Sequence, residues 1–158
     1  MGSDAFPVKP GTYALLLYLP NEKVIAVGRL GPICFPAGFY IYVGSAFGPG
    51  GLSARIGRHL RAVKKCHWHI DYLREEAVVI EVWTSTPSDA LKQECQWVRL
   101  IRSMPGALHP ADGFGSSDCS CRAHLVYFGE KPPFTDFQTV AGKHLRRISR
   151  TAASLNVC

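Results

Sequence analysis

The chain has 158 residues, of which 47% are hydrophobic, so it can bury the core of one compact domain but would be cramped as two. Eighteen lysines and arginines against twelve aspartates and glutamates give a formal net charge of +6, which favours a polyanionic partner. The sequence contains neither an apolar run of about 18 residues that could span a bilayer nor a secretory signal pattern. We therefore expect an intracellular protein, cytoplasmic or nucleoid-associated, with no membrane partner.

The first part of the chain predicts a small antiparallel sheet. Residues 11–19, GTYALLLYL, are apolar on both faces, which is typical of a central strand. Turn residues follow, and further strands are predicted over 24–30 and 39–46, the last with strict alternation of its side chains. Together these segments predict a three-stranded antiparallel meander.

Two tyrosines and a glycine-rich loop lie at one end of this predicted sheet. In a plausible register Tyr13 and Tyr42 place both hydroxyls on one face, and ordinary packing as a cross-strand pair is the alternative. Residues 45–51, SAFGPGG, form a loop of small residues that lets a backbone or a phosphate come close. Followed by arginines, this arrangement predicts a surface that handles phosphate.

The helix predicted over 51–63 carries those arginines. Arg55 and His59 fall one turn apart at the border of its apolar stripe, where a side chain can aim its polar head into a cleft. Arg58 and Arg61 lie further out. Arg55 is therefore a candidate site residue, with a solvated or salt-bridged helix arginine as the alternative.

The next segment, 66–73 (CHWHIDYL), is dense in groups that titrate or bind metals. His67 and Asp71 are four residues apart and could face each other on a helix. They could form a structural pair, or they could take part in proton transfer.

A single carboxylate stands out in the second half of the chain. A strand is predicted over 77–84, and capping residues begin a helix near residue 86 that runs to about 104. Glu94 falls in the middle of the apolar face of this helix, where an isolated charge is very costly. We expect a cation to meet Glu94, either a metal ion or an arginine such as Arg55.

Three soft metal ligands lie within six residues near the end of the predicted domain. Cys119, Cys121 and His124 could contribute to a zinc site, with Cys66 or His67 as a distant fourth ligand. A Cys-x-Cys spacing is unusual for a structural zinc finger, so buried thiols with a hydrogen-bonded histidine are the favoured interpretation.

The last part of the chain is basic. After a strand predicted over 123–128, cationic residues at helical spacing predict a tail that touches nucleic-acid backbone or is simply solvated. We divide the chain into a leader (1–10), a domain (11–130) and a basic tail (131–158). The candidate nucleic-acid-binding residues are Arg58, Arg61, Lys64, Lys65, Lys143, Arg146, Arg147 and Arg150.

The order and spacing of these motifs resemble those of the GIY-YIG nuclease superfamily over most of residues 11–128. The elements that carry the resemblance are Gly11-Thr12-Tyr13, Tyr42-Val43-Gly44, Arg55 after the glycine-rich loop, and Glu94 in a later helix. More narrowly, HWHIDYL, the Glu-Cys-Gln-Trp element and FGSSDC are similar to an uncharacterised subgroup found alone or beside base-excision repair domains.

This resemblance implies an α/β (α+β) fold, with a central antiparallel sheet of about three strands flanked by helices. It also implies a DNA endonuclease, with a role such as DNA repair, that hydrolyses phosphodiester bonds with one Mg²⁺ or Mn²⁺ ion. Glu94 would hold the ion and Arg55 would balance charge on the phosphoryl oxygens. Tyr13 would activate or orient the attacking water and Tyr42 would position water or phosphate. The candidate proton relays are His59, His67 and His69.

The alternative is a catalytically weak or inactive nucleic-acid-binding module on the same fold. Thr12 and Val43 replace isoleucines of the family, and its late asparagine has no well-placed counterpart in this chain. A carboxylate such as Glu94 in an apolar helix face favours the enzyme instead. Both interpretations predict duplex or branched DNA as the partner.

Overall fold

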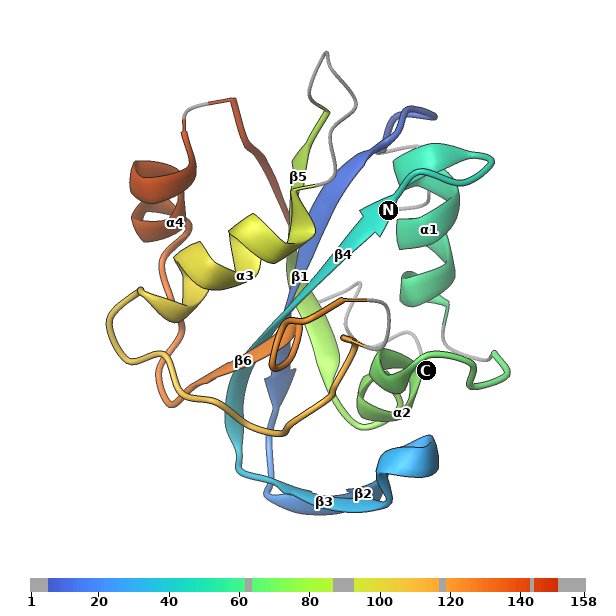
Figure 1. Ribbon diagram of the computed structural model, residues 1–158, viewed down its shortest axis with the longest axis vertical. Helices are drawn as coiled ribbons and strands as arrows, with labels where there is room; N and C mark the ends of the chain where they lie inside the picture. Colours follow the sequence, from blue (N-terminus) through green and yellow to red (C-terminus); the bar gives the residue numbers. More distant parts are fainter. Residues whose placement is uncertain (1–5, 62–63, 87–92, 117–118, 143, 151–158) are drawn as a thin grey trace.

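The computed structural model describes residues 6–61, 64–86, 93–116, 119–142 and 144–150. Its centre is a five-stranded sheet with the order β6-β4-β1-β5-β7, and every neighbouring pair in it is antiparallel (Figure 1). The strands of this sheet are β1 (Gly11–Leu19), β4 (Gly38–Ala46), β5 (Val78–Ser85), β6 (Leu125–Phe128) and β7 (Arg146–Ser149).

The predicted three-stranded meander is wrong. The second predicted strand leaves the central sheet: β2 (Lys23–Ala26) pairs instead with β3 (Pro32–Phe35), and a short 3-10 helix, η2 (Gly28–Leu30), connects them. Three of the four β2 residues are exposed, so this strand lacks the apolar faces of a sheet interior. β1 is buried along nearly its whole length and takes β4 and β5 as its two neighbours. The central sheet is therefore larger than the predicted one.

Helices cover both faces of the central sheet. In Figure 1, α3 and α4 lie on one side of the strands and α1 and α2 on the other. None of the helices in the described ranges is both long and apolar enough to cross a membrane. The helices are α1 (Gly51–Leu60), α2 (His69–Arg74), α3 (Glu94–Arg102) and α4 (Phe134–Ala141).

The two faces of the sheet form two separate hydrophobic cores, and β1 contributes to both. Tyr13 and Leu15 pack with α1 and α2, whereas Ala14 and Leu16 pack with α3 and α4. Alternate residues of a strand point to opposite faces, so a strand between two helical layers must be apolar throughout. This confirms the prediction that residues 11–19 form a central strand.

Two predicted helices differ from the structure. In the described residues α3 begins at Glu94, and residues 87–92 of the predicted helix lie outside them. Glu94 is consequently in the first turn and half-buried, rather than in the middle of the buried face. In the predicted basic tail, residues 146–149 form β7, which pairs with β5 at the edge of the sheet. The helical spacing of the basic residues did not decide the structure, because backbone pairing with β5 holds this segment as a strand.

Candidate functional site

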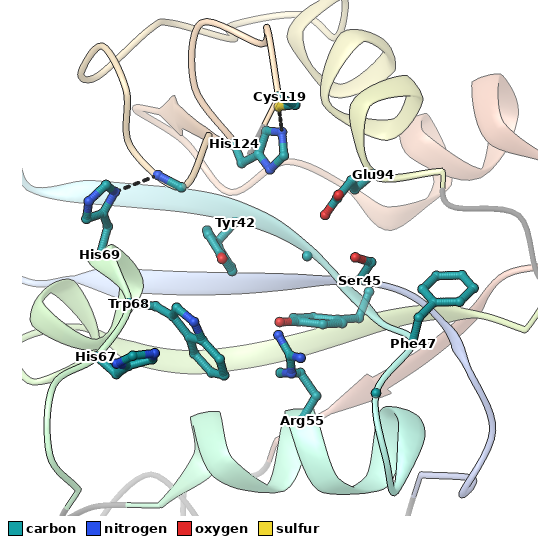
Figure 2. A pocket seen from close by; sticks show the side chains of 14 residues that line it. Tyr42, Ser45, Phe47, Arg55, His67, Trp68, His69, Glu94, Cys119 and His124 are labelled. Atoms are coloured by element: carbon teal, nitrogen blue, oxygen red, sulfur yellow. Dashed lines mark hydrogen bonds between the residues drawn. The ribbon is translucent and has the colours of Figure 1, made fainter. Parts of the chain in front are cut away.

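A cleft with a volume of about 600 Å³ lies between α1, the ends of β1 and β4, and the first turn of α3. Figure 2 shows Arg55 pointing into it from α1 and Glu94 from α3 on the other side. Of the seven predicted catalytic residues, six line this cleft: Tyr13, Tyr42, Arg55, His67, His69 and Glu94.

The tyrosines reach the cleft because of the register between β1 and β4. Tyr13 pairs with Gly44, and Tyr42 pairs with Leu15. Both tyrosines belong to the core on the α1 and α2 side, which confirms that they share one face. A Cβ atom at Gly44 would collide with the Tyr13 hydroxyl. Glycine at this position therefore lets the Tyr13 ring cross β4.

Behind the cleft, His59 contacts Tyr13. The Tyr13 hydroxyl lies 2.7 Å from His59 Nε2, and His59 is completely buried. Burial lowers the pKa of His59 to about 3, and the nearby Asp71 opposes this shift only partly, so the ring is neutral. Among the described residues His59 Nδ1 has no hydrogen-bond partner. A buried N–H without a partner is rarer than a buried acceptor without one, so we assign the proton to Nε2, which donates to Tyr13.

Both phenols are neutral hydrogen-bonding groups. Burial raises the pKa of Tyr13 well above its ordinary value, Tyr42 and Glu94 add to this, and the charge and hydrogen bond of Arg55 act in the opposite direction. Burial and then Glu94 likewise raise the pKa of Tyr42. Because His59 Nε2 donates to the Tyr13 oxygen, the hydroxyl proton of Tyr13 is free to donate into the cleft that Tyr13 lines.

Trp68 fixes the two arginines of α1 that are nearest the cleft. The guanidinium carbon of Arg55 lies 4.5 Å from the centroid of the Trp68 ring, and that of Arg58 lies 4.1 Å from it. Arg58 also donates two hydrogen bonds of 2.8 Å to the buried carboxylate of Asp71. The guanidinium of Arg58, a predicted nucleic-acid contact, is thus paired with Asp71, whereas Arg55 faces the cleft.

The predicted pairing of His67 with Asp71 takes a different form. Asp71 accepts hydrogen bonds from the backbone amides of His67 and Trp68, at 2.8 and 2.9 Å, and its side-chain partner is Arg58. The exposed His67 ring packs edge-on against Trp68. His69 Nδ1 accepts a hydrogen bond of 2.9 Å from the Gly115 amide. His69 thereby links α2 to the loop before β6.

Glu94 forms no ion pair with a basic residue that the structure describes. Its carboxylate faces the cleft (Figure 2), where its charge acts to raise the pKa of Tyr13, of Tyr42 and of His124. The direct pair with Arg55, one of the two partners predicted for Glu94, is not formed.

Beside Glu94, four side chains form a group that could hold a metal ion. Their ligand atoms all lie within 4.8 Å of one another, and the residues are Cys95, Cys119, Cys121 and His124. The last three were predicted from the sequence, whereas Cys95 was not, because it lies in α3, 24 or more residues from the other ligands. The predicted fourth ligands lie elsewhere: Cys66 Sγ donates to Glu75 at 3.2 Å, and His67 packs on Trp68.

The remaining predicted nucleic-acid contacts fall into two places. Arg61 and Lys65 are exposed beyond α1, and Lys64 Nζ binds the Arg61 carbonyl at 3.0 Å. Arg146 and Arg147 are exposed on β7, which β5 separates from β1. Lys143 lies outside the described residues. Arg150, at the end of β7, donates its backbone amide to Ile80 at 2.9 Å.

Comparison with known proteins corrects the family resemblance. A family model described as "Domain of unknown function DUF123" matches residues 12–147, and no GIY-YIG family matches. The resemblance to the GIY-YIG superfamily is therefore not supported, because it rested on a few short motifs spread over the chain. No curated protein and no solved structure matches the chain. By the extent of the match, this chain belongs to the DUF123 family.

Proposed function

We propose that this protein hydrolyses phosphodiester bonds of DNA with one Mg²⁺ or Mn²⁺ ion bound at Glu94. One observation carries the proposal: a carboxylate without an ion pair among the described residues faces an arginine and two tyrosine hydroxyls across a single cleft. Hard divalent cations bind carboxylate oxygens, and Mg²⁺ often uses one or two of them together with water and substrate phosphate.

Each side chain has a role that follows from its position. The metal ion would supply a water of lowered pKa and would polarise the phosphoryl group. Arg55, oriented by its stacking on Trp68, would stabilise charge on the phosphoryl oxygens, which a planar guanidinium does well. Tyr13 and Tyr42, kept neutral by burial, would donate hydrogen bonds that orient the water or the phosphate.

The surroundings of the cleft favour a polyanionic substrate. A smaller cavity of about 190 Å³ adjoins the cleft and is lined by Gly48, Gly51, Arg55 and Arg58, among others. Arg61 and Lys65 are exposed just beyond α1, and the chain carries a net charge of +6. A nucleic-acid backbone could follow this path, because basic side chains and glycine-rich turns bind successive phosphates.

A binding module without catalysis is the second candidate. It is favoured by the protonation states in the cleft, because Tyr13 and Tyr42 have raised pKa values and His59 is neutral with a pKa of about 3. The two phenols are protonated near neutral pH and so cannot accept a proton from water, and His59 is too weak a base to take one. On this interpretation Arg55 and the exposed basic residues bind DNA, and Glu94 binds no ion.

The deciding experiment measures cleavage and binding of labelled duplex, single-stranded, flap and branched DNA with Mg²⁺ or Mn²⁺. We expect Glu94→Gln to abolish cleavage with binding retained, since the amide keeps the shape of the side chain but loses its charge. Arg55→Lys should slow cleavage on the order of 100-fold, the usual loss for a group that stabilises transition-state charge.

Matched controls separate these effects from those of the same chemical change made away from the cleft. Glu130→Gln and Arg102→Lys make the same chemical changes at exposed positions that do not line the cleft, and both should cleave like the wild type. Full activity of Glu94→Gln would reject the proposal. Salt-sensitive binding without cleavage of any substrate by the wild type would favour the binding module.

A further inference from the structure

Three thiols and one imidazole converge beside the cleft from two separate parts of the chain. Cys95 lies in the first turn of α3, and the other three residues lie between 119 and 124, in the segment that enters β6. Cys119 Sγ is 3.1 Å and Cys95 Sγ is 3.8 Å from the same atom, His124 Nε2. The two sulfurs thus face one ring nitrogen, as they would around a shared ion (Figure 2 shows the contact between Cys119 and His124).

These distances match a tetrahedral zinc centre. With Zn–S bonds of about 2.3 Å and Zn–N bonds of about 2.0 Å, a tetrahedral site separates sulfur from nitrogen by about 3.5 Å and two sulfurs by about 3.8 Å. The two distances to His124 Nε2 bracket the sulfur–nitrogen spacing, and all four ligand atoms lie within 4.8 Å of one another. Small side-chain adjustments would therefore complete the coordination.

The imidazole is already held in the position that a metal ligand needs. The His124 backbone is fixed on both sides: its amide donates to Phe114 at 2.8 Å and its carbonyl accepts from Val43 at 3.0 Å. A ligand held in this way loses little freedom when a metal binds.

We propose that Cys95, Cys119, Cys121 and His124 bind one zinc ion in a structural site. Four protein ligands close the coordination shell, which is the mark of a structural rather than a catalytic zinc. Three thiolates with one imidazole select Zn²⁺ over Mg²⁺ or Ca²⁺, which prefer oxygen. This ion is distinct from the one proposed at Glu94.

The zinc ion would fix the first turn of α3 to the loop before β6. Glu94 is the neighbour of Cys95 in that turn, so the same cross-link would hold the Glu94 carboxylate in the cleft. This consequence for Glu94 rests on the proposed function, whereas zinc binding itself does not.

The test is the metal content of the full chain purified without chelators. We expect about one zinc per chain in the wild type and in Cys34→Ser, and much less in Cys121→Ser. Cys34 is a matched control, because it is an exposed free cysteine outside the group, 3.3 Å from Glu22. Replacing zinc with Co²⁺ should give intense thiolate-to-cobalt charge-transfer absorption in the wild type and in Cys34→Ser, and weaker absorption in Cys121→Ser.

A second measurement on the wild type keeps the proposal testable if Cys121→Ser does not fold. Alkylation followed by mass spectrometry should modify Cys34 both with and without zinc. The three cysteines of the group should be protected only in the zinc-loaded protein. Absence of zinc with no cobalt charge-transfer band would overturn the proposal, as would a disulfide within the group or stoichiometric iron in place of zinc.

Failure of the zinc proposal can be told apart from failure of the proposed function. Stoichiometric zinc in a protein that cleaves no DNA would reject only the nuclease. Mg²⁺-dependent cleavage by a protein that never binds zinc would reject only the zinc site. If both proposals hold, Cys121→Ser should lose zinc and also lose cleavage, while Cys34→Ser keeps both.

Discussion

At the scale of single residues, Tyr13 joins the interior of the protein to the cleft. Its oxygen lies 2.7 Å from His59 Nε2, and its ring fills the space that Gly44 leaves open. Arg55 opposes the rise in the Tyr13 pKa that burial causes. His59 therefore orients the hydroxyl, which can direct its own proton into the cleft. Such an arrangement suits a group that orients a reactant more than one that removes a proton.

Tyr13→Phe tests this role directly. The ring and its packing remain, so the protein should fold, but the donor into the cleft is lost and cleavage should fall on the order of 100-fold. His59 Nε2–H would also lose its buried acceptor, which should lower the free energy of unfolding by about 1 to 3 kcal/mol. Cleavage assays and urea denaturation measure the two effects.

Tyr40→Phe is the control for this substitution. Tyr40 is on the same face of the sheet and donates a hydrogen bond of 2.6 Å to the Pro36 carbonyl, but it does not line the cleft. Its phenylalanine variant should lose some stability and keep full cleavage. Equal activity of Tyr13→Phe and Tyr40→Phe would exclude a catalytic role for the Tyr13 hydroxyl.

Residue patterns predicted much of the cleft because its members are chemically conspicuous. Tyr13, Tyr42 and Arg55 were found from alternation in strands and from a helix border, both of which are local properties. Glu94 was found as an anomaly, although the reason given for it was wrong in detail, since it lies in the first turn of α3. Cys95 was missed because its partners are 24 or more residues away, and sequence spacing carries no signal for that approach.

At the scale of elements, one ion pair fastens α1 to α2. The Asp71 carboxylate is fully buried and accepts hydrogen bonds from Arg58 and from two backbone amides at the start of α2. Burial acts to raise the pKa of Asp71, but these hydrogen bonds and the Arg58 charge outweigh it and lower the pKa to about 2. The pair also places Trp68, on which Arg55 rests.

Asp71→Asn should therefore destabilise the protein strongly. It leaves the Arg58 guanidinium without its counter-charge, and breaking a buried pair from one side typically costs about 3 to 5 kcal/mol. The comparison is Asp112→Asn, which removes an exposed carboxylate that pairs with Arg122 and His109 and should lower the free energy of unfolding far less, because solvent screens exposed ion pairs. Urea denaturation gives both values, and equal losses would show that the buried pair contributes no more than the exposed one.

Pairing between elements was harder to predict than the elements themselves. The segments that form β1, β4 and β5 were each recognised, yet the sheet was placed wrongly because consecutive strands were assumed to be neighbours. β2 follows β1 in sequence, but β1 is so completely buried that it pairs with β4 and β5 instead. Partner choice depends on which faces the whole chain can bury, and a local pattern does not contain that information.

At the scale of the whole molecule, a sheet between two helical layers places titratable groups deep in the structure. His59 is covered by Tyr13, Tyr42 and Trp68, and the charged groups that influence its pKa are Asp71, Lys64, Arg58 and Arg55. Burial dominates over all of these charges and lowers the pKa to about 3, compared with an ordinary value of 6.5. His59 therefore binds a proton much more weakly in the folded protein than in the unfolded chain.

This difference predicts how stability depends on pH. Between about pH 6.5 and 3 the unfolded state carries a proton on His59 that the folded state lacks, so the free energy of unfolding should decrease as pH falls through this range. The expected slope from His59 is about 1.4 kcal/mol per pH unit. Asp71, whose pKa is lowered from 3.8 to about 2, adds stability that is present above pH 4 and is lost between about pH 4 and 2.

Urea denaturation of the wild type and of His59→Gln at a series of pH values isolates the histidine. Glutamine can still donate to Tyr13 but does not titrate, so the stability of His59→Gln should fall less steeply between pH 6.5 and 4. The slopes are compared rather than the absolute stabilities, because the substitution itself changes packing. Other titrating groups act equally in both proteins and cancel in the difference between the two slopes. Parallel curves would mean that His59 binds a proton equally well in the folded and unfolded states. The assignment of a neutral His59 ring beside Tyr13 would then be wrong.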